Sequence, residues 1–166
     1  MKKVEFEGIQ LYIAKEVYEP SDDTELLLEA IKKYDVRKKK ILEIGTGTGI
    51  ISIYLARHGA EVTATDISPV VINNAIKNAQ INKVNIRFLI GDLFDPIPQW
   101  EQFDMIIFNP PYLPFDEEYD SLLPQPLRRS VIGGIKGNEI ILNFIRKLPK
   151  HLKNDGKALI VVSTLC

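Results

Sequence analysis

The feature that most constrains the fold of this 166-residue chain is a glycine-rich turn between two apolar segments. The run Ile41-Leu42-Glu43-Ile44 comes first, Gly45-Thr46-Gly47-Thr48-Gly49 follows, and a helical apolar pattern then continues over residues 50–56. Glycines at alternate positions let the backbone approach a ligand closely, where a side chain would clash. This order of strand, glycine turn and helix is typical of the first unit of a nucleotide-binding α/β domain.

The remainder of the chain continues this alternation. We predict further strands at residues 61–65, 85–90, 103–108 and 157–162, and helices that begin at Pro20-Ser21 and cover residues 69–80 and 138–152. Ser68 is expected to cap the helix whose first residue is Pro69, and Pro149 is expected to interrupt the last helix. Alternation of this kind predicts a three-layer α/β fold with a mostly parallel central sheet.

Two segments fall outside the alternation. Residues 1–36 carry short apolar alternations ahead of their helix, and residues 113–137 contain three prolines and three glycines without clear periodicity. A stretch of about 25 residues without periodicity is more often functional than idle in a small domain. We therefore expect one domain, in which an amino-terminal segment (1–36) precedes a core (37–166), and in which residues 113–137 form a substrate-facing loop.

Composition and charge exclude several classes of protein. The 21 Lys and Arg residues are balanced by 22 Asp and Glu residues, so no general attraction for a polyanion exists and a nucleic-acid substrate is disfavoured. A single cysteine, Cys166, cannot form an internal disulfide, and one Cys with two His provides no zinc ligand set. There is neither a signal-peptide pattern nor an apolar run of the ~20 residues that a membrane span needs. We expect a soluble, cytoplasmic protein without a metal site.

Acidic residues follow the next two predicted strands. Asp66 lies 21 residues after Gly45, where a carboxylate can accept from both hydroxyls of a ribose. Asp92 comes after the third strand and could accept from an adenine amino group, with the backbone of Leu93 beside the ring. Ile50 replaces the last glycine of the dinucleotide pattern, which makes NAD the weaker interpretation. Since ligands of open α/β sheets bind outside these strand ends, we expect a nucleoside-containing cofactor there.

Asn109-Pro110-Pro111-Tyr112 follows the fourth predicted strand. A planar NH2 group is a poor nucleophile because its lone pair is delocalised, so a catalyst must hold both hydrogens and the plane. The Asn109 side-chain oxygen and the Pro110 carbonyl can supply two adjacent acceptors, and successive prolines keep them fixed. Tyr112 offers an aromatic face for the planar group. The alternative interpretation is a rigid turn that only ends a buried strand.

Together these motifs resemble those of S-adenosylmethionine-dependent class I methyltransferases with a Rossmann-like fold. The upstream segment Val17 to Thr24 and the stretch Gly133-Gly134 to Ile140 are further similar to the HemK family, in its short eukaryotic and archaeal branch. That resemblance covers residues 17–163 and implies Asn109, Pro110, Pro111 and Tyr112 as catalytic. It implies the following cofactor contacts: Thr24, Glu43, Gly45, Thr46, Gly47, Gly49, Asp66, Ile67, Asp92, Leu93 and Asn109.

The family resemblance implies methyl transfer to the side-chain amide of a release-factor glutamine. Adenine N6 methylation of DNA or RNA stays open as the alternative, because adenine also presents a planar NH2 group. The acidic residues 116–120 favour a protein acceptor, Arg128-Arg129 is a counter-signal, and a non-catalytic interaction module is a third reading. The resemblance also implies a small zinc-binding activator at the edge formed by residues 85–90. The resemblance further implies a strand pair after the fifth strand, which residues 1–166 do not include, either because the chain is natively short or because it is a fragment. In both cases we expect an unpaired edge that another chain covers, or low stability.

Overall fold

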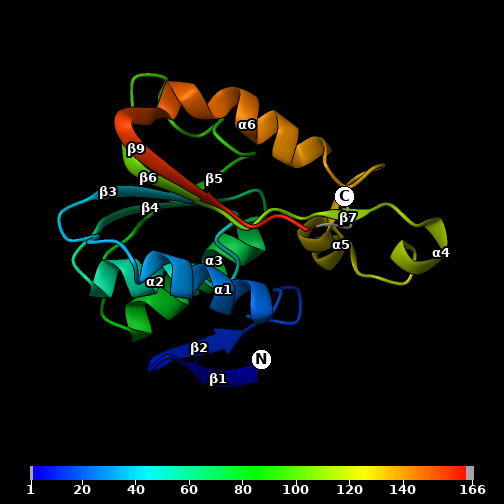
Figure 1. Cartoon of the computed structure of the whole chain (residues 1–166). Coiled ribbons are helices and arrows are strands. Elements are labelled where there is room, and N and C mark those ends of the chain that lie inside the picture. Colours follow the sequence, from blue (N-terminus) through cyan, green and yellow to red (C-terminus); the bar gives the residue numbers. More distant parts are fainter. Residues whose placement is uncertain (1, 164–166) are drawn as a thin grey trace.

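Five parallel strands form the centre of the molecule in the computed structural model, which describes residues 2–163 (Figure 1). They are β3 (Lys40–Ile44), β4 (Glu61–Asp66), β5 (Arg87–Ile90), β6 (Phe103–Phe108) and β9 (Leu152–Ile160). Their order across the sheet is β5-β4-β3-β6-β9, and every neighbouring pair is parallel. The chain adds β4 and β5 on one side of β3 and then adds β6 and β9 on its other side. The switch in strand order therefore lies between β3 and β6, which is where open α/β sheets bind ligands.

Helices cover both faces of this sheet, which confirms the predicted three-layer arrangement. Helices α1 (Asp22–Ile31), α2 (Ile50–Arg57) and α3 (Pro69–Ile81) lie on one face, and α6 (Glu139–His151) lies on the other (Figure 1). Side chains alternate between the two layers along each strand. In β6, Met105 and Ile107 belong to the core under α1 to α3, whereas Ile106 and Phe108 pack with Phe144 of α6. Phe103 also belongs to the α6 side, because the strand is irregular between Phe103 and Met105.

Several element boundaries differ from their prediction. The interruption at Pro149 was wrong, because α6 continues through this residue to His151. A proline so close to the helix end removes one late helical hydrogen bond, and the helix ends two residues later in any case. Strand β9 begins at Leu152 rather than at residue 157, and its register with β6 shifts between Leu152 and Lys157. Strand β5 begins at Arg87, two residues later than predicted.

The amino-terminal alternations form a two-stranded hairpin of β1 (Lys2–Phe6) and β2 (Ile9–Ile13). Its turn residues Glu7 and Gly8 both have positive φ, at 52° and 71°. Two such residues match the twist of a tight hairpin. The apolar residues of β2 are buried against α2 and α3, so the hairpin adds an outer layer to that face.

Three asparagines at four-residue spacing attach this hairpin to α3. Their side-chain Oδ1 atoms accept hydrogen bonds from three backbone N–H groups, two of β2 and one just after it. Ala14 N–H donates to Asn74 at 3.0 Å, Tyr12 N–H to Asn78 at 2.8 Å and Gln10 N–H to Asn82 at 3.2 Å. Their Nδ2 atoms donate to the carbonyls of Tyr12 and Gln10 at 2.7–3.1 Å. One face of a helix thus provides the hydrogen bonds that a neighbouring strand would otherwise make.

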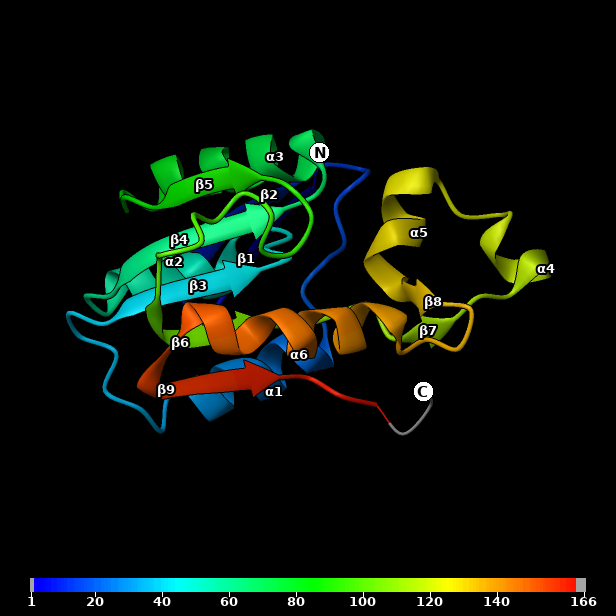
Figure 2. The same ribbon diagram turned by 90° about the horizontal axis from the view of Figure 1, so that it is seen from above.

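The segment 113–137 contains more regular structure than the predicted loop. It includes β7 (Leu113–Pro114), α4 (Glu117–Asp120), α5 (Gln125–Val131) and β8 (Ile132–Gly134). The short parallel pair of β7 and β8 joins its two ends into a stem. Figure 2 shows this segment, hereafter the lid (residues 113–137), beyond the carboxyl ends of the sheet strands.

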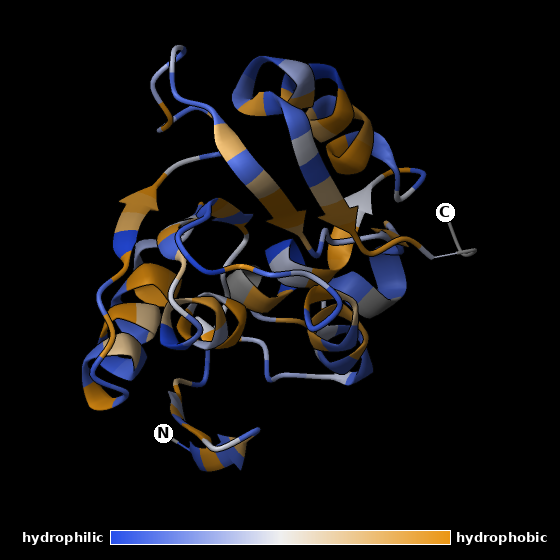
Figure 3. Cartoon of the chain, turned by 60° about the vertical axis from the view of Figure 1, so that its left-hand side comes forward, coloured by the Kyte–Doolittle hydropathy of each residue, from blue (hydrophilic) through white to orange (hydrophobic). Residues whose placement is uncertain are grey.

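Helix α6, at the top of Figure 3, carries both hydrophobic and hydrophilic residues, whereas α2 is buried over most of its length. Within residues 2–163, no helix is both long and apolar enough to cross a bilayer.

Candidate functional site

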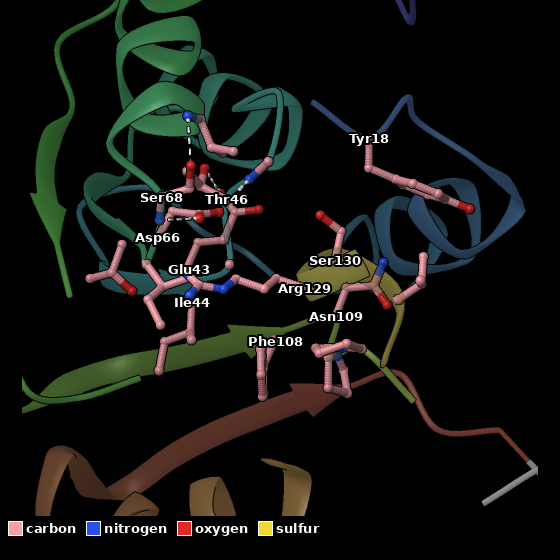
Figure 4. Close-up of a pocket in the computed structure, with 18 of the residues that line it drawn as sticks. Tyr18, Glu43, Ile44, Thr46, Asp66, Ser68, Phe108, Asn109, Arg129 and Ser130 are labelled. Carbon is pink, nitrogen blue, oxygen red and sulfur yellow. Dashed lines mark hydrogen bonds between the residues drawn. The ribbon is translucent and has the colours of Figure 1, made fainter. Parts of the chain in front are cut away.

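A cavity of about 460 Å³ opens at the carboxyl ends of β3, β4 and β6, between the first turn of α1 and the lid. Figure 4 shows Glu43, Thr46, Asp66 and Ser68 on one side of it and Tyr18, Asn109 and Ser130 on the other. The structure brings together most of the residues that the sequence singled out. Those lining the cavity are Thr24, Glu43, Gly45, Thr46, Gly47, Asp66, Ile67, Asp92, Leu93, Asn109, Pro110, Pro111 and Tyr112.

The glycine turn forms the floor of the cavity next to β3. Gly47 has φ of 56°, and a side chain at this position would meet open space, so only backbone faces a ligand there. Thr46 N–H donates to the Thr65 carbonyl at 2.9 Å, which ties the turn to β4. Gly49 does not line the cavity: with φ of 83° it precedes α2, and a Cβ there would lie 3.2 Å from Ala75 Cβ. Its structural role is the close approach of α2 to α3.

Glu43 is a buried carboxylate at the end of β3. Its Oε2 accepts from Thr46 Oγ1 at 2.7 Å, from Ser52 N–H at 3.1 Å and from Ser52 Oγ. Burial raises the pKa of Glu43 to about 7, and these hydrogen bonds only partly offset that effect. A cationic group of a ligand would compensate the ionised carboxylate, so this end of the cavity suits an ammonium.

Asp66 at the end of β4 is held by the backbone. Its Oδ1 accepts from Ser68 N–H at 3.0 Å and its Oδ2 from Gly47 N–H at 3.3 Å. Burial raises the pKa of Asp66 despite these hydrogen bonds. A carboxylate has about four acceptor positions, so two remain for the hydroxyl groups of a ligand.

Asp92 and Leu93 border the cavity beyond β5. Asp92 is exposed, whereas the Leu93 side chain is buried in the core with Phe94 and its backbone has φ of 46°. A non-glycine residue in this left-handed conformation is uncommon and reflects a tightly shaped loop. Since the Leu93 side chain belongs to the core, its backbone is what it can offer to a flat ligand.

The turn Asn109 to Tyr112 continues from β6 into the opposite wall. The Oδ1 atom of Asn109 is buried, and no described residue donates a hydrogen bond to it. A buried acceptor without a donor costs free energy, and such an atom at a cavity wall indicates a ligand that supplies the donor. Pro110 is buried beside it, and the Tyr112 hydroxyl donates to Asp23 Oδ2 at 2.7 Å. The wall therefore presents an acceptor that an NH2 group would satisfy.

Several residues of the cavity were not identified from the sequence. The first turn of α1 and its preceding segment contribute Tyr18 and Asp23, and the lid contributes Arg129 and Ser130. The Arg129 side chain projects between the two sides of the cavity (Figure 4). The sequence singled out the segment Val17 to Thr24 and the pair Arg128-Arg129, but it assigned none of these four residues to the cavity. Contacts between segments about 90 residues apart leave no local pattern.

Comparisons with known proteins agree with this geometry. The family model described as MTS, Methyltransferase small domain, matches residues 19–165. A candidate N5-glutamine methyltransferase of Methanocaldococcus jannaschii is 44% identical over 98% of this chain and 80% of its own length. The release factor glutamine methyltransferase of Lactococcus lactis is 35% identical over 92% of this chain, which spans 58% of that relative's length.

Solved structures share the fold. The ribosomal protein L11 methylase of Lactobacillus delbrueckii superposes with a TM-score of 0.65 and 26% identity, covering 87% of this chain and 61% of that one. The 16S rRNA N2 G1207 methyltransferase of T. thermophilus, solved with AdoMet and guanosine, has a TM-score of 0.76 and 21% identity, covering 99% and 42%. At the latter identity the likeness concerns the fold alone.

Proposed function

The chain belongs to the small-domain methyltransferases, within the HemK family of N5-glutamine methyltransferases, and we propose that it methylates the side-chain amide nitrogen of a release-factor glutamine. S-Adenosylmethionine is the methyl donor in this proposal. When bound, it supplies a methyl group that its sulfonium already activates. The protein's own contribution is then to position the acceptor and to exclude water.

The observation that carries the proposal is the buried, unsatisfied Asn109 Oδ1 at the cavity wall. Together with the Pro110 carbonyl it offers two acceptors for the two hydrogens of an NH2 group, and Tyr112 provides an aromatic face for its plane. Acceptors that are fixed before the reaction stabilise the transition state without reorganising. We propose Asn109, Pro110, Pro111 and Tyr112 as the acceptor-binding catalytic turn.

The opposite side of the cavity fits the donor. We propose that Glu43 takes its amino group, that Asp66 takes the ribose hydroxyls, and that Asp92 and the Leu93 backbone border the adenine. The buried Glu43 carboxylate and the two remaining acceptor positions of Asp66 support this assignment. We place the other donor contacts at Gly45, Thr46, Gly47 and Ile67 on this side, at Thr24 of α1 and at Asn109 of the opposite wall.

A protein acceptor accounts better for the entrance than a nucleic acid does. The lid carries the exposed carboxylates Asp116, Glu117 and Glu118, and the phosphates of DNA or RNA would be repelled there. The names of the relatives point to release factors. A translation-factor substrate would place the reaction in the cytoplasm.

We further propose that a small zinc-binding activator pairs with β5. This strand is the outer one of the sheet beside β4, so its other edge can receive a strand. Ile90 is 52% exposed on it. Ile86 and Phe88 are half-buried against the core, so they serve mainly packing.

One assay tests the proposed reaction. The purified chain, with and without an activator, is incubated with labelled S-adenosylmethionine and with release factor, DNA or tRNA in separate reactions. We expect label in the release factor, released as N5-methylglutamine on digestion, and a loss of about 100-fold or more for Asn109→Ala. Label in DNA or tRNA instead would favour adenine N6 methylation. Cofactor binding without transfer to any acceptor would indicate a non-catalytic module.

A further inference from the structure

Asp23 and Tyr112 join two walls of the cavity that are 89 residues apart in the chain. The Tyr112 hydroxyl donates to Asp23 Oδ2 at 2.7 Å, and both residues line the cavity. Tyr112 ends the catalytic turn, whereas Asp23 belongs to α1 on the other side of the entrance. The contact is therefore a link across the acceptor half of the site.

Asp23 is itself held firmly. It is the second residue of α1, after the N-cap Ser21, and the capping box between Ser21 and Thr24 fixes this first turn. A carboxylate is favourable at this position, because the N-terminus of a helix carries a partial positive charge. The buried Thr24 beside it lines the donor half of the cavity. One helical turn thus touches both halves.

The hydrogen bond also determines the state of Tyr112. Its proton is directed at a carboxylate, and this bond is the main reason that the pKa of Tyr112 is raised to about 12. Tyr18, the other titratable group that acts on it, raises this pKa further. Tyr112 stays neutral at working pH, and its ring cannot turn about χ1 without breaking a charge-assisted bond.

We propose that Asp23 is a positioning residue for methyl transfer, which holds the Tyr112 ring in the plane that the acceptor amide packs on. The inference rests on the proposed function, because it concerns the same acceptor site. Asp23 acts through Tyr112, and its own contact with the acceptor is not required. Small errors of orientation at a reacting group lower the rate strongly, so losing this bond should lower kcat.

Four variants separate this role from a general effect on folding. We expect Asp23→Ala and Tyr112→Phe each to lower kcat about tenfold, and the double variant to be no slower than either single one. Asp23→Asn keeps an acceptor oxygen and should recover much of the rate. Asp22→Ala removes the same charge from the neighbouring exposed position of the turn, outside the cavity, and should leave kcat unchanged. The dissociation constant for S-adenosylhomocysteine should change less than threefold in all of them.

A titration reports on the pair without any acceptor. The absorbance of tyrosinate near 295 nm is followed with pH in the wild-type chain, in Asp23→Ala and in Tyr112→Phe. Of six tyrosines, one should titrate late in the wild type and return towards the ordinary pKa of about 10 in Asp23→Ala. Tyr112→Phe should remove that late component and so assign it.

The two arms separate failure of this inference from failure of the proposed function. If the wild-type chain transfers methyl to release factor while Asp23→Ala is equally fast, the positioning role is wrong and the proposed function stands. If the fold-losses in kcat of Asp23→Ala and Tyr112→Phe multiply in the double variant, Asp23 acts independently of Tyr112 and the inference is overturned. If the wild type transfers to no release factor, the proposed function fails and this inference with it, whatever the titration shows.

Discussion

At the scale of single residues, the cavity controls the ionisation of two carboxylates. Glu43 is raised to a pKa of about 7 and Asp66 is raised in the same direction, both because burial disfavours the charged form. Such groups destabilise the folded chain when they ionise without a partner. The donor side of the site is therefore built at a cost in stability that a bound cation and hydroxyl groups would offset.

The effect of Glu43 should be visible as a pH dependence of stability. The pKa of Glu43 is about 7 in the folded chain and about 4.5 in the unfolded chain, so the unfolded chain ionises first as the pH rises. The contribution of Glu43 to the free energy of unfolding is therefore fully present below pH 4.5 and is lost as the pH rises to about 7. Glu43→Gln cannot ionise but can still accept from Thr46 and Ser52. We expect the wild type to lose up to ~3 kcal/mol more than Glu43→Gln between pH 5 and pH 8.

Urea denaturation of both proteins at the two pH values measures this difference. Asp66 is present in both and cancels in the comparison. An equal decrease in the free energy of unfolding of both proteins between pH 5 and pH 8 would mean that Glu43 does not titrate in this range.

Asp66 gives a prediction for donor affinity. Asp66→Ala should weaken the binding of S-adenosylhomocysteine by ~1.5–3 kcal/mol, as expected for lost charge-assisted hydrogen bonds to hydroxyl groups. Isothermal titration calorimetry measures it. Asp95→Ala is the matched control, since Asp95 is exposed and pairs with Lys147 outside the cavity. An unchanged affinity in Asp66→Ala would place the ribose elsewhere.

At the scale of elements, the sequence predicted the strands and helices whose patterns are local. The sheet strands and α1 to α3 follow from apolar runs and from caps such as Ser21 and Ser68. The hairpin attachment did not follow, because Asn74, Asn78 and Asn82 look like the polar face of an ordinary helix. The link between Asp23 and Tyr112 was equally hidden, since a single contact across 89 residues has no periodicity. The donor side was predictable because its residues follow strand ends.

Asn78 connects α3 and β2 to the glycine turn of the site. It is fully buried, and its Nδ2 donates to the Thr48 carbonyl of the glycine turn at 2.9 Å as well as to Tyr12. Asn78→Ala should lower the free energy of unfolding by ~2–4 kcal/mol, because the Tyr12 N–H and the Thr48 carbonyl lose their partner. Asn73→Ala, on the exposed side of the same helix, should cost under ~0.5 kcal/mol.

Chemical denaturation of the two variants tests this. Equal stabilities would show that water replaces the Asn78 side chain at both backbone groups.

At the scale of the whole molecule, the cavity has walls from three separate parts of the chain. The segment before α1, the strand ends and the lid each contribute, and the lid is joined to the catalytic turn through its stem. At the stem, a Cβ on Gly133 would lie 2.5 Å from the Pro111 carbonyl oxygen. The stem of the lid is therefore packed closely against the catalytic turn.

A ligand in this cavity should therefore protect the lid. Arg129 lines the cavity from α5 and is exposed, so trypsin can cleave after it when the lid opens. We expect saturating S-adenosylhomocysteine to slow cleavage at Arg129 at least ~10-fold, by mass action on the open form. Cleavage after Lys83, in the exposed turn beyond α3, is the internal control and should not change. Mass spectrometry of the fragments over time measures both sites; equal slowing would indicate a global effect.

The asparagine contacts between α3 and β2 set a limit on the length of the hairpin. Four residues of a helix advance by about 6.0 Å, whereas two residues of a strand advance by about 6.6–6.8 Å. The two repeats drift apart by under ~1 Å at each step, which side-chain rotation can absorb over three asparagines. A fourth asparagine, at the third step, would bring the accumulated offset to about 2 Å, beyond the tolerance of a hydrogen bond. A longer hairpin in a relative would need another partner for its added residues, because a helix cannot match a strand indefinitely.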